Sequence, residues 1–238
     1  MIRKIIAIVA AAVLVTAVQT ARAAISLADL VANNGSLTID DKVFSGFGYI
    51  PTGLSGFDAS QVLVTASIGP GGVDYLTFTG PIGIAGYVAQ TTYADLALTY
   101  TVTSLGNPIS MIDQLYTGGA QNGSVVVSET ATSSGAPTVH STLTLIDVSD
   151  PNVYPNGPID AFDIAEGDLL TVVPPQNVLH VTKDIAFAIY APGGMASVSV
   201  VQQSFHQVPE ATTVIAGALL LLPFGISTLR ILRKTRLA

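Results

Sequence analysis

The chain has 238 residues, a formal net charge of −7, and 49% hydrophobic but only 11% charged residues. This composition excludes a disordered, solvating chain, because it supplies enough apolar side chains for a core. Cysteine is absent, which excludes disulfide frameworks, thiolate metal sites and a cysteine nucleophile. The length fits one large domain, or one medium domain with targeting segments.

The basic residues are concentrated at the two ends of the chain. Between Ala24 and Pro209 only Lys42 and Lys183 are basic, against fifteen Asp and Glu residues, so this stretch carries a net charge of −13. A nucleic-acid-binding protein needs clustered Lys and Arg to neutralise phosphates. Nucleic acid is therefore excluded as a partner. We expect the two lysines to pair with carboxylates, and such pairs contribute little where they are exposed.

The first segment, residues 1–23, has the pattern of an export signal. Two basic residues precede an uncharged apolar run over residues 5–18, and the small residues Ala21 and Ala23 stand at positions −3 and −1 of a cleavage site. The pattern predicts a signal helix that engages the export translocon and is removed by signal peptidase, leaving a chain that begins near Ile25. The alternative is a buried N-terminal helix.

Residues 24–207 are expected to form one domain. Ser26 is placed to cap a helical turn that follows it. Beyond this turn the apolar residues alternate with polar ones, which is typical of strands and not of helices. We expect strands at residues 37–39, 43–50, 61–68, 73–79, 95–103, 109–116, 124–132, 138–146, 178–190 and 196–205.

Turn signals separate these runs, among them Asn34-Gly35, Gly80-Pro81, Asn122-Gly123 and Gly193-Gly194. About ten short strands without an amphipathic helix predict an all-β fold, an antiparallel β-sandwich or jelly roll. An alternating arrangement of strands and helices is not expected, because it needs helical segments of ten or more residues.

One segment between two expected strands is strongly acidic. Ca²⁺ binds flexible loops that supply several carboxylate and carbonyl oxygens, so this segment is a candidate calcium site, although it lacks the order of an EF-hand loop. The alternative is a solvated loop that is acidic without binding metal. The candidate ligands are Asp147, Asp150, Asp160, Asp163, Glu166 and Asp168.

The sequence contains no nucleophile elbow, metalloprotease motif, phosphate-binding loop or dinucleotide fingerprint. His140, His180 and His206 lie apart in strand-like surroundings, and we interpret them as ordinary strand positions. A catalytic triad needs only proximity in space, so sequence leaves that alternative open. Tryptophan is absent, which makes a sugar-cleaving site with aromatic stacking unfavourable.

Residues 212–229 form an uncharged, mostly apolar run. As a helix it would be about 27 Å long, close to the thickness of the hydrocarbon layer. A basic tail, residues 230–238, follows directly, and the positive-inside rule places it in the cytoplasm. The run therefore predicts a membrane-spanning helix with a stop-transfer tail, whose basic residues are Arg230, Arg233, Lys234 and Arg236.

Directly before this span the sequence reads Val208-Pro209-Glu210-Ala211. A Pro-Glu dipeptide, an apolar span and a short Arg-rich end, in that order, resemble the PEP-CTERM sorting signal of diderm bacteria. The usual family motif is Pro-Glu-Pro, so Pro209 and Glu210 match it and Ala211 departs from it. The resemblance covers residues 208–238 and implies processing by an exosortase-type sorting enzyme. The alternative is a C-terminal anchor that is never cut.

These features together predict an exported protein. Its precursor would be anchored in the inner membrane through residues 212–229, and the mature chain would reach the cell surface or the extracellular matrix. We expect a structural or adhesive role, not catalysis, with extracellular polysaccharide as one partner and with no cofactor other than the candidate Ca²⁺. The alternatives are a surface carbohydrate-binding module and a secreted hydrolase.

Overall fold

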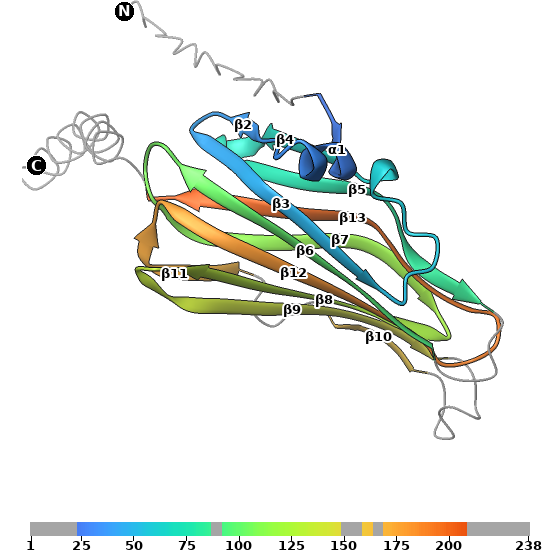
Figure 1. The fold of residues 1–238 in the computed structure, drawn as a ribbon. Coiled ribbons are helices and arrows are strands. Elements are labelled where there is room, and N and C mark those ends of the chain that lie inside the picture. The colour runs from blue at the N-terminus through green and yellow to red at the C-terminus, as the bar shows by residue number, and fades with distance from the viewer. Residues whose placement is uncertain (1–22, 87–91, 149–158, 164–168, 209–238) are drawn as a thin grey trace, which may run out of the picture.

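The computed structural model describes residues 23–86, 92–148, 159–163 and 169–208 (Figure 1). Two β-sheets lie face to face across these residues, and every paired strand is antiparallel to its neighbour. The predicted all-β, sandwich-like class is therefore confirmed. The predicted membrane helix and nearly all of the predicted signal helix lie outside the described residues.

The six-stranded sheet, called sheet A, has its strands in the spatial order β1 (Ile25–Ser26), β4 (Leu63–Ile68), β5 (Asp74–Gly86), β13 (Gly194–Gln207), β7 (Ile109–Gln121) and β11 (Leu169–Gln176). The seven-stranded sheet, called sheet B, has the order β10 (Ile159–Asp163), β9 (Ala136–Val148), β8 (Gly123–Ser133), β12 (Val178–Ile189), β6 (Thr92–Ser104), β3 (Lys42–Thr52) and β2 (Leu37–Ile39).

Helical structure is short in the described part of the chain. The helix α1 (Leu27–Ala32) begins at Ser26, whose side chain accepts a hydrogen bond from the backbone N–H of Asp29, so the predicted cap is confirmed. Two 3₁₀ turns, η1 (Ala59–Gln61) and η2 (Pro70–Gly72), precede β4 and β5. The structure contains, in the residues it describes, no helix of the length and apolar character that a membrane crossing requires.

All ten predicted strands are present, but the turn predicted at Gly80-Pro81 is wrong. Strand β5 runs through this dipeptide to Gly86. The register of β13 against β5 shifts between Val198 and Val200, so the extra residue of β5 is taken up in a bulge. A bulge tolerates proline because the ladder hydrogen bond is already interrupted there.

Three strands were not predicted, and each lies at an edge of a sheet. Strand β1 has two residues, and β10 and β11 fall in or beside the acidic segment that was expected to be a loop. Strand β11 contains Pro174 and Pro175, which a sheet accepts at its edge. Conversely, Gln61 and Val62 precede β4 and are not part of it.

The core fills the space between the two sheets, and strand β12 shows how the sequence builds it. Its side chains alternate strictly from Val178 to Ile185, and the buried ones are Leu179, Val181, Lys183 and Ile185. Aromatic side chains pack at one end of this core, where the rings of Phe44 and Phe205 lie 5.3 Å apart. The same alternation carries Lys183 into the interior, because it stands between Val181 and Ile185 on the inward side.

Candidate functional site

The two lysines of residues 24–207, Lys42 and Lys183, are both completely buried, with 0% of each side chain exposed. The expected pairing with carboxylates is confirmed, but neither pair is at the surface. Charges in a protein interior are costly unless they are paired and hydrogen-bonded. The surroundings of the two lysines are therefore the most informative polar sites in the described part of the chain.

Lys183 belongs to a row of polar residues that crosses three neighbouring strands of sheet B. Lys183 on β12 stands opposite Glu129 on β8, and Glu129 stands opposite Ser141 on β9. A second row faces it from sheet A, where Gln203 on β13 stands opposite Gln114 on β7. All five side chains are buried. We call this set the Lys183 network.

Hydrogen bonds close the Lys183 network across the gap between the sheets. The Lys183 ammonium forms an ion pair with Glu129 Oε2 and donates to Gln114 Oε1 at 3.1 Å. Gln203 Nε2 donates to Glu129 Oε1 at 3.2 Å. Gln114 Nε2 donates to Ser141 Oγ at 2.7 Å. One lysine, one carboxylate and two amides thus bind one another with no net charge.

The hydroxyl of Tyr100 on β6 is buried beside this network. It has no hydrogen-bond partner among the described residues, and neither does Gln203 Oε1. Burial, followed by the charge of Glu129, raises the pKa of Tyr100 well above its usual value. The phenol therefore stays protonated and remains available as a donor.

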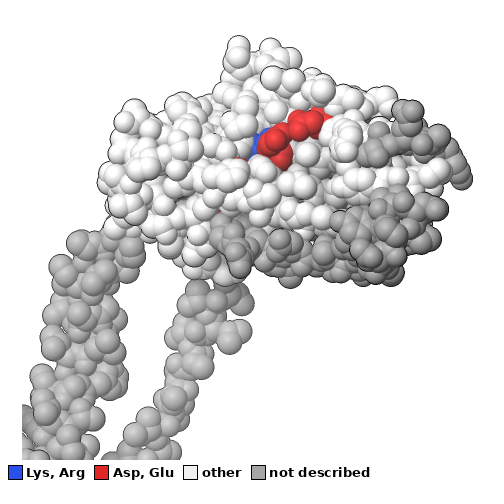
Figure 2. Space-filling view, turned by 90° about the horizontal axis from the view of Figure 1, so that it is seen from below, with Lys and Arg blue, Asp and Glu red and all other residues white. Residues whose placement is uncertain are grey.

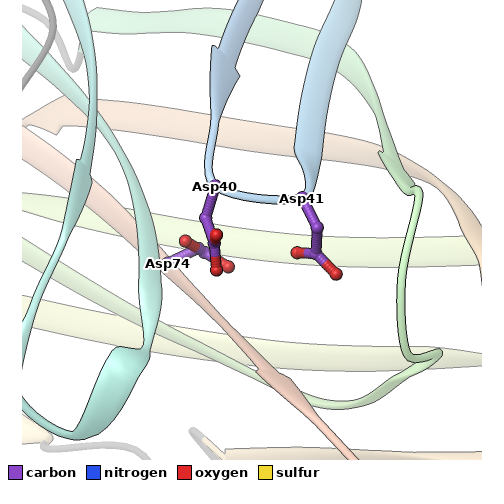
Figure 3. Close-up of side chains that lie close together, drawn as sticks. All are labelled: Asp40, Asp41 and Asp74. Atoms are coloured by element: carbon purple, nitrogen blue, oxygen red, sulfur yellow. The ribbon is translucent and has the colours of Figure 1, made fainter.

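Lys42 lies at the end of the sandwich where the chain leaves it. The two-residue turn between β2 and β3 consists of Asp40 and Asp41, and Asp40 adopts a left-handed backbone with φ of 47°. Asp74 opens strand β5 of the other sheet. Figure 3 shows the three carboxyl groups brought together from these elements, and their oxygens lie within 4.8 Å of one another. Together with Lys42 we call them the Lys42 cluster.

The Lys42 ammonium is the cation of this cluster. It forms an ion pair with Asp41 and lies 3.3 Å from Asp74 Oδ2. The Asp41 side chain is 25% exposed and the Asp74 side chain only 1%. Unlike the Lys183 network, the cluster has three carboxyl groups for one lysine and an opening to water.

The two carboxyl groups that contact Lys42 have different surroundings, and their pKa values therefore shift in opposite directions. Burial raises the pKa of Asp74 to about 6 despite the Lys42 charge, and the charges of Asp40 and Asp41 add to the rise. Burial also acts on Asp41, but hydrogen bonds from Lys42 and Gln207, together with the Lys42 charge, lower its pKa. Asp41 therefore carries the charge that balances Lys42, and Asp74 is the group that takes up a proton.

The same cluster holds the last strand in place. Gln207, the final residue of β13, donates from its amide to Asp41 Oδ2, to Asn107 O at 2.9 Å and to Ser104 Oγ at 3.1 Å. The backbone N–H of Val208 donates to Pro108 O at 3.2 Å. The chain is therefore tied to the sandwich up to the residue before Pro209.

Only part of the candidate calcium segment is described. Asp147 lies in β9 and Asp160 and Asp163 in β10, and the backbone of Asp160 pairs directly with that of Asp147. The other candidates, Asp150, Glu166 and Asp168, lie outside the described residues. Calcium binding by this segment stays a prediction. Within the described ranges, the acidic group with metal-ligand spacing is Asp40, Asp41 and Asp74, and Lys42 already provides its cation.

The remaining predicted site residues fall into two groups. Ala23, exposed and without secondary structure, stands two residues before β1, and Val208 follows β13. The three histidines all lie in strands, where their rings contact hydroxyl groups, including those of Thr101 and Ser204. Outside the described residues lie Ala21, Pro209, Glu210, Arg230, Arg233, Lys234 and Arg236.

Sequence reasoning singled out neither Glu129 nor Gln114 and Gln203. A signal was present, because each stands at an inward position of an alternating strand, as Glu129 does after Val125 and Val127. Charged side chains are sparse elsewhere too: Figure 2 shows a face where most described side chains are uncharged and the acidic ones are gathered in one group.

Comparisons with models of protein families, with curated proteins and with solved structures gave no match.

Proposed function

We propose that this chain is an exported structural protein of the cell surface or extracellular matrix, delivered by its PEP-CTERM-like C-terminal signal. The observation that carries the proposal is where the strands begin and end. Within the described residues, the first strand starts at Ile25 and the last ends at Gln207, next to the expected cleavage site after Ala23 and to the Pro209-Glu210 dipeptide.

This agreement matters because cutting at both signals would leave the fold intact. Removal of residues 1–23 takes away no described strand, and neither does a cut beyond Val208. Gln207 and Val208 are hydrogen-bonded to the β6–β7 connection, so the end of the mature chain would stay attached to the sandwich. A sorting enzyme could therefore act on the segment beyond Val208 without unfolding its substrate.

The orientation of the buried polar side chains also supports a structural role. The Lys183 network is closed on itself between the sheets, so its lysine, carboxylate and amides cannot contact an external substrate. We propose that these groups hold the fold together and do not act on a ligand.

The proposal is tested by following the chain to its destination. The double variant Pro209→Ala/Glu210→Ala removes the dipeptide but keeps the span and the basic tail. We expect it to accumulate in the inner membrane, whereas the wild type reaches the cell surface. Thr212→Ala is the matched control, because it leaves the dipeptide and all tail charges unchanged, and it should behave like the wild type. Equal surface amounts of wild type and double variant would contradict sorting at the dipeptide.

A further inference from the structure

The Lys183 network places a nucleophile, an electrophile and a proton acceptor side by side in a dry interior. Lys183 Nζ is 3.1 Å from Gln114 Oε1, so the Nζ atom lies beside the carbonyl of the amide. The same Nζ atom is paired with Glu129 Oε2. All three side chains are at most 1% exposed, so bulk water does not compete for the amide.

We propose that Lys183 and Gln114 form an intramolecular isopeptide bond, with Glu129 carrying the protons. An amine attacks a carbonyl only in its neutral form, and a buried carboxylate in contact with an ammonium is placed to remove the proton. Fixed proximity of reacting groups replaces the entropy that a reaction between separate molecules would lose. The bond would link β12 of sheet B to β7 of sheet A.

The reaction balances without any further reactant. Glu129 takes a proton from the Lys183 ammonium, and the lone pair of Nζ forms a bond to Cδ of Gln114 while the carbonyl electrons move to Oε1. When the carbonyl re-forms, the bond from Cδ to Nε2 breaks. Glu129 relays the proton that the attacking nitrogen loses to Nε2. Ammonia leaves, takes up the remaining proton from Glu129 and departs as ammonium.

The surrounding side chains fit these roles. Ser141 Oγ accepts a hydrogen bond from Gln114 Nε2 at 2.7 Å and so fixes the plane of the amide. Gln203 donates to Glu129 Oε1 and holds the other carboxylate oxygen in place. Lys42 offers a built-in comparison, because its two ion-pair partners are carboxylates and one of them is partly exposed to water.

The test is the mass and the tryptic map of the full chain, purified and fully denatured. Bond formation lowers the mass by about 17 Da, the mass of one ammonia. An acylated Lys183 also resists trypsin, so the peptides 43–183 and 184–230 should be replaced by one modified peptide covering both. Cleavage after Glu129 and Glu166 should then release a branched peptide that carries Gln114 and Lys183.

Two variants and one control sharpen the result. Lys183→Arg keeps the positive charge but supplies no neutral amine, and Glu129→Gln removes the proton acceptor, so both should have the unmodified mass. Lys42→Arg should keep the loss of about 17 Da, because Lys42 takes no part in the reaction. If either network variant fails to fold, the wild-type digest decides alone. An unmodified wild-type mass with complete cleavage after Lys183, or a mass loss that persists in Lys183→Arg, would overturn the proposal.

Discussion

The Lys42 cluster and the Lys183 network answer the same physical problem in different ways. Both bury a lysine between the sheets, but the Lys183 network supplies one carboxylate with amides around it and is neutral. The Lys42 cluster supplies three carboxyl groups, one of which, Asp74, takes up a proton near pH 6. The comparison indicates that carboxyl groups at the open end of the sandwich can lose their charge by protonation or contact water. In the middle of the sandwich, each buried charge needs a partner of opposite charge among the neighbouring side chains.

The largest expected effect comes from removing each lysine in turn. Lys183→Met leaves Glu129 buried without its lysine partner and also removes the proposed bond between β12 and β7, so it should cost at least about 3–5 kcal/mol of unfolding free energy. Lys42→Met should cost clearly less, because Asp74 can be protonated and Asp41 reaches water. Chemical denaturation measures both. The double variant Lys183→Met/Glu129→Leu should recover the part of the loss that comes from the unpaired Glu129 charge. If Lys183→Met and Lys42→Met lost the same unfolding free energy, the proposed difference between the two buried lysines would be wrong.

The pH dependence of stability tests the protonation of Asp74 in the Lys42 cluster. The pKa of Asp74 is about 6 in the folded chain, against 3.8 for an unperturbed aspartate, so between these values the folded state binds more protons than the unfolded state. The unfolding free energy should therefore fall as the pH rises from about 4 to about 6, by up to about 3 kcal/mol.

Asp74→Asn should flatten this slope, which denaturation curves at several pH values would detect. Asp95 also has a pKa raised to about 6, by burial and by the neighbouring Asp184, so a smaller slope remains. Because the pKa of Asp41 is lowered, this group changes the unfolding free energy only below about pH 4. A variant slope as steep as that of the wild type would show that Asp74 is not the group responsible.

Calcium distinguishes the acidic segment from the Lys42 cluster. If the segment around Asp160 and Asp163 binds Ca²⁺, the ion stabilises the folded state by RT ln(1 + [L]/Kd), about 2.7 kcal/mol at one hundred times Kd. The chain should then melt at a higher temperature in millimolar Ca²⁺ than in EDTA. Asp160→Asn/Asp163→Asn should abolish the shift, and Asp74→Asn should leave it, because Lys42 already balances that cluster. Equal melting temperatures of the wild type in Ca²⁺ and EDTA would show that the acidic segment does not bind Ca²⁺.

The smallest expected effect concerns charges on the outer face of sheet B. Asp95 and Asp184 lie on the neighbouring strands β6 and β12, and Asp184 contributes to the raised pKa of Asp95. Asp184→Asn should therefore stabilise the chain at pH 7, by less than about 1 kcal/mol, and leave it unchanged near pH 4. Asp113→Asn removes one negative charge elsewhere and serves as the control. If Asp113→Asn raised the unfolding free energy at pH 7 by as much as Asp184→Asn does, the effect would come from the net charge and not from the Asp95–Asp184 pair.

Alternation predicted most of the fold because a strand with one buried face needs an apolar residue at every second position. In β9 the residues Ser141, Leu143 and Leu145 stand at every second position, and all three are buried. The edge strands β10 and β11 were missed because their residues are acidic or proline-rich, and a sheet accepts such runs most readily at its edges. Their pairing depends on partners distant in sequence.

The candidate sites were harder to predict, for a different reason. Each inward polar residue looks like an interruption of its own strand, and its partner lies 54 residues away in the case of Lys183 and Glu129. Only the register of three strands brings them into one row. The neighbouring pair Asp41 and Lys42 was visible in the sequence, but the burial of Lys42 follows from Asp74, which arrives from the other sheet.

The most direct test of sorting at both ends is the intact mass of the protein recovered from the surface of producing cells. We predict a chain that begins near Ile25 and ends between residues 207 and 211, because the proposed processing would remove both end segments and leave the sandwich. A mass that includes every residue through Ala238 would contradict this prediction and would leave a sandwich on an uncut membrane anchor.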